Sequence, residues 1–287
     1  RFWQQRGYIS EARARLEAMA EGLDDLPPIE RARFAEALGG LAYWQSDRPA
    51  ATRWYDEQLA LWREIGDRRE IANALYNRAY ADMIVVMAGQ ATRDSLDESY
   101  RLFDEALAIF RDLGDRAGEG NIVWGLGSFH YFTADAATAE TWFRQSLELH
   151  RTAGDRTMEA WSLHMLAMSQ VGQRRWREAK VNARHALRHF HEAGDVAGLT
   201  LVLDDLALIA VGEDERVRVG RLWGAARHLQ GTTGVTLADY VNHTNLLFGV
   251  LLPGAYLSAA ELEGLGAEGA AMGLDEIVGY ALEDEVE

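Results

Sequence analysis

The feature that most constrains the fold is a Gly-Asp pair that returns at a nearly fixed interval along the chain. The pairs begin at Gly66, Gly114, Gly154 and Gly194, so successive pairs are 48, 40 and 40 residues apart. Gly234 lies 40 residues beyond Gly194. A period of this length is typical of tandem repeats, in which each unit packs on its neighbours. We therefore expect an extended array of repeats.

Each Gly-Asp pair predicts the end of one helix and the start of the next. A glycine after a helix readily adopts the left-handed conformation that ends it. The aspartate that follows can accept hydrogen bonds from the first free amides of the next helix. Asp67 and Glu70 have the spacing of a capping box. The extra length of the 48-residue interval falls near residues 88–94, where we expect a turn.

Within each repeat the pattern is that of two helices joined by a turn. The first helix carries a small residue at equivalent places, namely Gly39, Ala79, Gly127, Ala167 and Ala207. The second helix carries a large residue in four of five copies, namely Tyr55, Phe103, Phe143 and Trp223. Small residues let helices approach closely, and large ones fill the space between them. We predict a truncated first repeat over 1–26, repeats over 27–66, 67–114, 115–154, 155–194 and 195–234, and a helical cap over 235–287.

This spacing of small and aromatic residues resembles that of tetratricopeptide repeats, in the variety with a 40-residue unit. Leu-Gly-Asp-Arg at 113–116 and Trp-Gly-Leu-Gly at 124–127 carry the resemblance most clearly. It covers about residues 1–234, where 7–12 resemble the turn and second helix of an earlier repeat. The resemblance implies an all-α fold, a right-handed superhelix of antiparallel helix pairs with a C-terminal helical cap. It also implies binding rather than catalysis.

A second, narrower resemblance lies at the C-terminal end. Residues 221–227 and 269–282 together resemble the C-terminal repeat region of actinobacterial LuxR-type and cyclase-linked signalling ATPases. This resemblance implies a sensing domain of a bacterial signalling or transcriptional regulator, attached to a nucleotide-binding switch domain outside this sequence. The chain itself has no Gly-x-x-x-x-Gly-Lys-Ser/Thr loop for phosphates. The alternative is a free-standing scaffold for protein–protein interaction.

The chain begins at Phe2 and Trp3 as if in mid-helix, which favours the fragment over the scaffold. Exposed aromatic residues at the end of a repeat array usually indicate a missing neighbour. We therefore expect Phe2, Trp3 and Tyr8 either to dock on a neighbouring domain or to form a homodimer.

The composition excludes several classes of function. The absence of cysteine excludes disulfides, thiolate chemistry and cysteine-ligated zinc. The net charge of −16 argues against a nucleic-acid partner, because the surface repels phosphates. No apolar run reaches the roughly 18–20 residues that span a bilayer, so we expect no membrane partner. With no signal peptide at the start and Lys180 as the sole lysine beside many arginines, we expect a cytoplasmic, bacterial protein.

The titratable residues form no convincing catalytic or metal-binding group. His185 and His189, with His191 nearby, have a spacing that could hold zinc. The same spacing also occurs on a solvated helix face, which we favour. Asp204 and Asp205 have no nucleophile or base at a matching repeat position. We expect no enzyme activity, no metal and no cofactor.

The candidate binding surface is the concave face of the array, lined by the first helix of each repeat. Residues at i, i+3, i+7 and i+10 or i+11 of that helix point inward. These positions are rich in Tyr and Trp, which bury a large area at binding hot spots. They suit a peptide, a protein or a small-molecule ligand, although the same side chains could pack between repeats. The candidate residues are Tyr43, Trp44, Asn73, Tyr76, Tyr80, Asn121, Trp124, Tyr131, Trp161 and His164.

Overall fold

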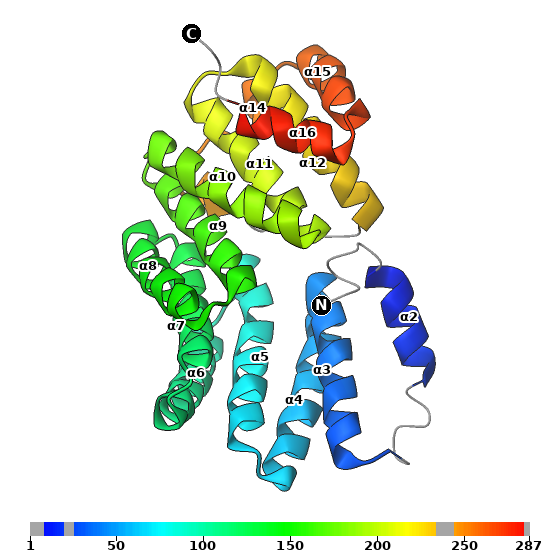
Figure 1. The fold of residues 1–287 in the computed structure, drawn as a ribbon, viewed down its shortest axis with the longest axis vertical. Coiled ribbons are helices and arrows are strands. Elements are labelled where there is room, and N and C mark those ends of the chain that lie inside the picture. Colours follow the sequence, from blue (N-terminus) through cyan, green and yellow to red (C-terminus); the bar gives the residue numbers. More distant parts are fainter. Residues whose placement is uncertain (1–8, 20–25, 234–243, 284–287) are drawn as a thin grey trace.

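The computed structural model describes residues 9–19, 26–233 and 244–283, and all regular structure in these ranges is helical (Figure 1). Helices stack as antiparallel pairs from α3–α4 to α11–α12, and the pairs rotate progressively into a superhelix. The predicted all-α fold of stacked helix pairs is therefore confirmed. Residues Phe2, Trp3 and Tyr8, for which we predicted docking or dimerisation, lie outside the described residues.

Ten helices make up the five pairs within residues 28–233. They are α3 (Pro28–Trp44) with α4 (Arg48–Ile65), α5 (Arg68–Met87) with α6 (Arg93–Leu113), α7 (Arg116–Phe132) with α8 (Ala136–Ala153), α9 (Arg156–Gly172) with α10 (Trp176–Ala193), and α11 (Val196–Gly212) with α12 (Arg216–Thr233). Helix α2 (Ile9–Met19) precedes them, and α14 (Pro253–Tyr256), α15 (Ala259–Ala271) and α16 (Leu274–Leu282) follow.

The Gly-Asp pairs separate the helices as predicted. Gly114 has φ 66°, in the left-handed region, and ends α6. The Asp115 side chain accepts a hydrogen bond from the Gly118 amide at 3.0 Å and caps α7. At the first pair, the Asp67 side chain accepts from the amides of Arg69 and Glu70.

The capping box predicted at Asp67 and Glu70 is incomplete. The Glu70 carboxylate accepts a hydrogen bond from the Asn73 side chain at 3.1 Å. The Glu70 carboxylate is thus held by the polar side chain one turn further along α5.

The small and large residues of each repeat meet as the sequence pattern requires. A Cβ atom added to Gly39 of α3 would lie 2.5 Å from the Tyr55 ring of α4. One added to Gly127 of α7 would lie 2.8 Å from the Phe143 ring of α8. Real Cβ atoms do not approach so closely, so glycine is what lets each aromatic ring pack against the neighbouring backbone.

The superhelix turns far enough for its first and fourth pairs to meet. The rings of Trp44 on α3 and Trp161 on α9 have centroids 5.8 Å apart. Next to them, Ile9 of α2 and Leu41 of α3 share a buried cluster with Ala197 of α11. The concave face is therefore bounded on both sides over this part of the array.

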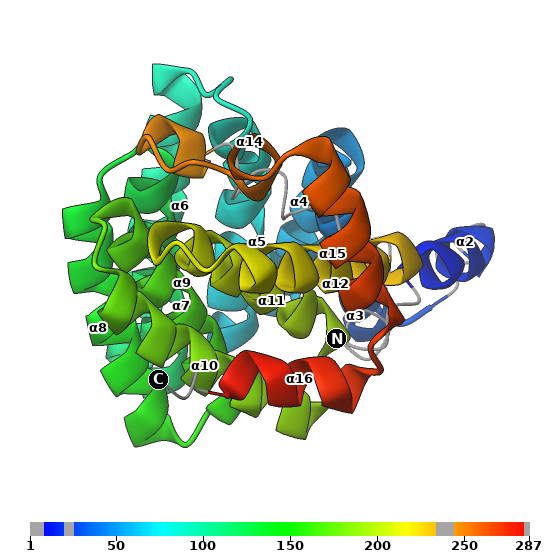
Figure 2. The same cartoon turned by 90° about the horizontal axis from the view of Figure 1, so that it is seen from above.

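Helices α14 to α16 lie across the end of the array, as Figure 2 shows. A Cβ atom on Gly224 of α12 would lie 2.2 Å from the backbone oxygen of Gly266 in α15, and one on Gly269 would lie 1.9 Å from that of Arg221. The two segments behind the second resemblance, 221–227 and 269–282, thus include both sides of one close helix contact. Arg218 then donates to the carbonyl of Ala281 at 2.6 Å and caps the end of α16.

Candidate functional site

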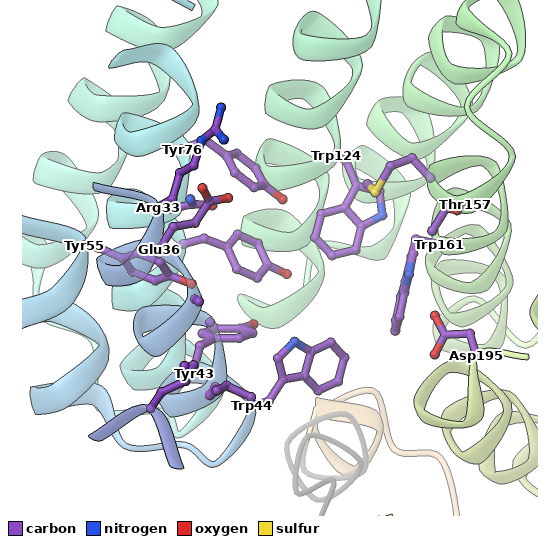
Figure 3. Close-up of a pocket in the computed structure, with 17 residues that line it drawn as sticks. Arg33, Glu36, Tyr43, Trp44, Tyr55, Tyr76, Trp124, Thr157, Trp161 and Asp195 are labelled. Carbon is purple, nitrogen blue, oxygen red and sulfur yellow. The ribbon is translucent and has the colours of Figure 1, made fainter. Parts of the chain in front are cut away.

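A cavity of about 550 Å³ lies between the first four helix pairs, and seven of its 17 lining residues are aromatic (Figure 3). We call it the aromatic cavity. Helix α3 supplies the longest stretch of its lining, and the rest comes from α2, α4, α5, α7, α9 and Asp195 at the start of α11. The lining residues are Leu16, Arg33, Glu36, Ala37, Gly40, Leu41, Tyr43, Trp44, Tyr55, Tyr76, Asn77, Tyr80, Trp124, Thr157, Met158, Trp161 and Asp195.

The structure brings together six of the ten residues predicted from the sequence as binding residues. They come from the first helices of four successive repeats, which all face the same space. These six are Tyr43, Trp44, Tyr76, Tyr80, Trp124 and Trp161. The other four do not line the cavity.

Tyr131 lies beneath the C-terminal part of the chain. Its hydroxyl donates a hydrogen bond to the Asn245 side chain at 2.9 Å, and its ring packs against Phe248 with centroids 5.5 Å apart. The Tyr131 side chain is 0% exposed. Residues 244–250 thus cover one end of the predicted groove, where a Cβ atom added to Gly172 of α9 would lie 3.0 Å from the Phe248 ring. We call this region the covered end.

His164 is engaged by the neighbouring repeat. Its Nδ1 atom lies 2.5 Å from the Oδ2 atom of Asp205 on α11, and both side chains are 2% exposed. Burial raises the pKa of the Asp205 carboxyl, although the contact with His164 acts in the opposite direction. His164, three residues after Trp161 on α9, therefore faces the interface with the fifth pair instead of the groove.

The two predicted asparagines also lie outside the aromatic cavity. Asn73 donates to Glu70 within α5, and the buried Oδ1 atom of Asn121 has no hydrogen-bond partner among the described residues. Asn77, one turn beyond Asn73, does line the cavity and donates to Gln58 at 3.2 Å.

Several lining residues were not among the predicted binding residues. Tyr55 of α4 was interpreted only as a packing residue, and Asp195 only as a helix cap. Leu16, Thr157 and Met158 also line the cavity, and no repeat position marked them. Leu16 belongs to α2, which packs on α3, and the turn of the superhelix brings the starts of α9 and α11 to the first repeat.

Five of the aromatic rings form a continuous line of contacts around the cavity. The centroid distances are 5.8 Å from Trp161 to Trp44, 6.3 Å from Trp44 to Tyr43, 5.2 Å from Tyr43 to Tyr80 and 5.4 Å from Tyr80 to Trp124. Adjacent rings are inclined by between 35° and 87°. Because the rings are inclined, they act as walls around a space rather than as one flat stack (Figure 3).

Burial favours the protonated form of the Tyr43 and Tyr80 hydroxyls in the cavity. Burial raises the pKa of Tyr43 well above its ordinary value and that of Tyr80 to about 12, despite interactions of Tyr80 with Ser128 and Tyr43. The charged lining residues are two acids, Glu36 and Asp195, and one base, Arg33. The cavity is therefore aromatic, with neutral hydroxyls and an excess of one negative charge.

The histidines considered for zinc are not gathered into a metal site. The Nε2 atom of His191 lies 2.8 Å from the Oδ1 atom of Asp275 on α16. The pKa of His185 is lowered, mainly by burial and to a smaller extent by the positive charge of Arg188. Within the described ranges, no group of three or more His, Cys, Asp or Glu residues could hold a metal ion. A membrane-crossing helix is likewise not found in that part of the chain.

Comparison with known proteins agrees with this architecture. The tetratricopeptide repeat family model matches residues 121–191, which run from α7 into α10. A crystal structure of BtubC (BKLC) from P. vanneervenii has a similar fold, with a TM-score of 0.53 and 15% sequence identity over 81% of this chain and 92% of that one. No curated protein sequence matches. Residues 121–191 thus resemble tetratricopeptide repeats in sequence, and most of the chain resembles the BtubC structure in fold.

Proposed function

We propose that this protein is a protein-interaction module that binds a segment of its partner in the aromatic cavity. The observation that carries this proposal is the convergence of Tyr and Trp residues from four successive repeats on one space. Aromatic side chains dominate the energy of protein interfaces, since they bury a large area and lose little conformational entropy. A volume of about 550 Å³ also falls within the usual range of ligand pockets.

The proposal favours a short partner segment over a long extended peptide. Residues 244–250 occupy the covered end of the concave face, where Tyr131 and Gly172 lie. A partner would therefore insert one or a few side chains into the cavity rather than lie along the whole groove.

A finer version of the proposal is that the module senses its ligand inside a bacterial signalling regulator. The support is that the cavity lies where Trp44 of the first pair contacts Trp161 of the fourth. A ligand wedged there would bind differently to wider and narrower forms of the superhelix and so shift their populations. Small-angle X-ray scattering should then show a change in the radius of gyration on ligand binding. An unchanged scattering profile would contradict the sensing function, and the scaffold function would remain.

Selection of random peptides displayed on phage tests the main proposal. Ala37 is an exposed residue that lines the cavity, so Ala37→Phe should block it without disturbing the core. Peptides selected on the unmodified protein should lose at least roughly tenfold in affinity for Ala37→Phe, which corresponds to about 1.4 kcal/mol. They should bind Ala37→Ser, the matched control, with unchanged affinity. Peptides that bind all three proteins equally would place the interaction elsewhere.

A further inference from the structure

The walls of the aromatic cavity indicate the chemistry of the group that enters it. Resting on the proposed function, we infer that the cavity takes the positively charged side chain of a lysine or arginine in the partner segment. Three features carry this inference: the inclined aromatic walls, the balance of charge around them, and the apolar residues that line the cavity beside them.

The aromatic walls attract cations. The face of each Tyr or Trp ring carries partial negative charge, so a cation within about 6 Å of the ring centre is stabilised. Five such rings, from Trp161 through Trp44, Tyr43 and Tyr80 to Trp124, surround the space in succession. In Figure 3 the Trp161 ring is seen edge-on, so one of its faces is turned toward the side where Trp44 and Trp124 lie.

The charged groups around the rings favour the same sign. Glu36 lines one side from α3, and the Asp195 carboxylate, which also accepts from the Gly198 amide at 3.0 Å, is turned toward Trp161 (Figure 3). Arg33 is the one opposing charge among the lining residues; it lies one turn before Glu36, and both side chains are exposed. The net charge of −16 on the whole chain adds long-range attraction for a basic segment.

The apolar residues of the cavity suit a long aliphatic stem. Leu16, Leu41 and Met158 line it together with the rings. Lysine and arginine pack their methylene stems on apolar surface while the charged end stays in a polar environment. An anionic group would find only Arg33 of opposite sign, and the aromatic faces would repel it.

The first experiment compares charged probes with neutral probes of the same shape. Tryptophan fluorescence and calorimetry would measure binding of Nα-acetyl-lysine N-methylamide against the norleucine analogue, and of the arginine derivative against the citrulline analogue. At least one charged probe should bind roughly tenfold or more tightly than its neutral counterpart. Equal binding within both pairs, or no binding of either charged probe, overturns the inference. The peptide selection with Ala37→Phe tests the cavity independently, so the two proposals can fail separately.

The second experiment separates the effect of charge from damage to the fold. Glu36→Gln should weaken binding of the charged probe several-fold and leave the neutral probe unchanged. Glu30→Gln, an exposed position on the same helix that does not line the cavity, removes the same charge and should change neither. Arg33→Gln should strengthen binding of the charged probe. If Glu36→Gln and Glu30→Gln behave alike, the local carboxylate has no role and the inference fails.

The third experiment tests the aromatic wall. Trp44→Leu keeps an apolar side chain but removes the ring. The ratio of the affinity for the charged probe to that for the neutral probe, which we call the advantage of the charged probe, should therefore fall several-fold. Trp142→Leu on α8 removes a tryptophan that does not line the cavity and should preserve that advantage. Circular dichroism checks that both variants fold. Retention of the full advantage in Trp44→Leu would contradict the inference.

Discussion

Two residues on the same helix, Trp124 and Tyr131 of α7, lie seven positions apart but have opposite surroundings. Trp124 forms a wall of the aromatic cavity, whereas Tyr131 is covered by Asn245 and Phe248. Helix α9 repeats the contrast, since Trp161 lines the cavity and Met168, seven positions later, contacts Asn245 at the covered end. An inward-facing aromatic residue thus lines the cavity only where the rest of the chain leaves it uncovered.

The largest expected effect comes from truncating one aromatic residue in each region. Tyr131→Ala should lower the free energy of unfolding by about 3–5 kcal/mol, because it opens a fully buried space and leaves the Asn245 side chain without its donor. Trp44→Ala, at a partly buried site facing the cavity, should cost about 1–2 kcal/mol. Urea denaturation measures both. Equal losses would mean that the two ends of the groove are packed alike.

Glycine substitutions sharpen the same contrast. Gly172→Leu places a side chain against Phe248, since a Cβ atom there would lie 3.0 Å from that ring, and should cost about 1–3 kcal/mol. Gly40→Leu projects into the aromatic cavity, where the only atom near a Cβ is the Tyr55 hydroxyl at 3.7 Å. It should preserve stability or raise it by about 0.5–1 kcal/mol through helix propensity. It should also abolish binding. A clear loss of stability in Gly40→Leu would show that the cavity is narrower than described.

Asn245 at the covered end and Asn73, which lies outside both regions, should differ in a similar way. Asn245→Ala leaves the buried Tyr131 hydroxyl without its acceptor, so thermal and chemical denaturation should report a loss of about 1–3 kcal/mol. Asn73→Ala removes only a contact with Glu70 one turn away on α5 and should cost about 0.5 kcal/mol or less. The reverse order would contradict the assignment of Asn245 as part of the covered end.

The smallest effect concerns the turn that follows Tyr131. Ala134 has φ 64°, a left-handed conformation that alanine adopts at a cost, so Ala134→Gly should stabilise the protein by up to about 1 kcal/mol. Ala137→Gly, in the exposed first turn of α8, should instead destabilise it by about 0.5–1 kcal/mol. Differential scanning calorimetry should show melting temperatures that move in opposite directions. Shifts of the same sign would reject the strained turn.

Much of the architecture follows from local patterns. The Gly-Asp pairs predict where helices end because glycine tolerates positive φ and aspartate caps the next helix, as at Gly114 and Asp115. The pairing of Gly39 with Tyr55 and of Gly127 with Phe143 follows from complementary size at fixed repeat positions. These features depend on contacts within a repeat, so a 40-residue period is enough to reveal them.

The candidate site follows only in part from the sequence. The repeat register predicts that Tyr43, Tyr80 and Trp124 face inward, and these residues do line one cavity. It does not predict that His164 pairs with Asp205 or that Asn73 turns to Glu70, because those contacts depend on neighbouring side chains. The sequence also contains no sign that Gly224 meets Gly266, since the contact joins the last repeat to a segment outside the period.

The sequence by itself determined the ends of the helices, their caps and part of the inward face of the repeats, because these depend on residues close together in the chain. The tertiary structure decided which part of that face stays open. Small rotations between successive pairs add up until Trp44 reaches Trp161, and residues 244–250 return to cover Tyr131. Both outcomes depend on contacts between residues more than one hundred positions apart, where a repeat pattern carries no information.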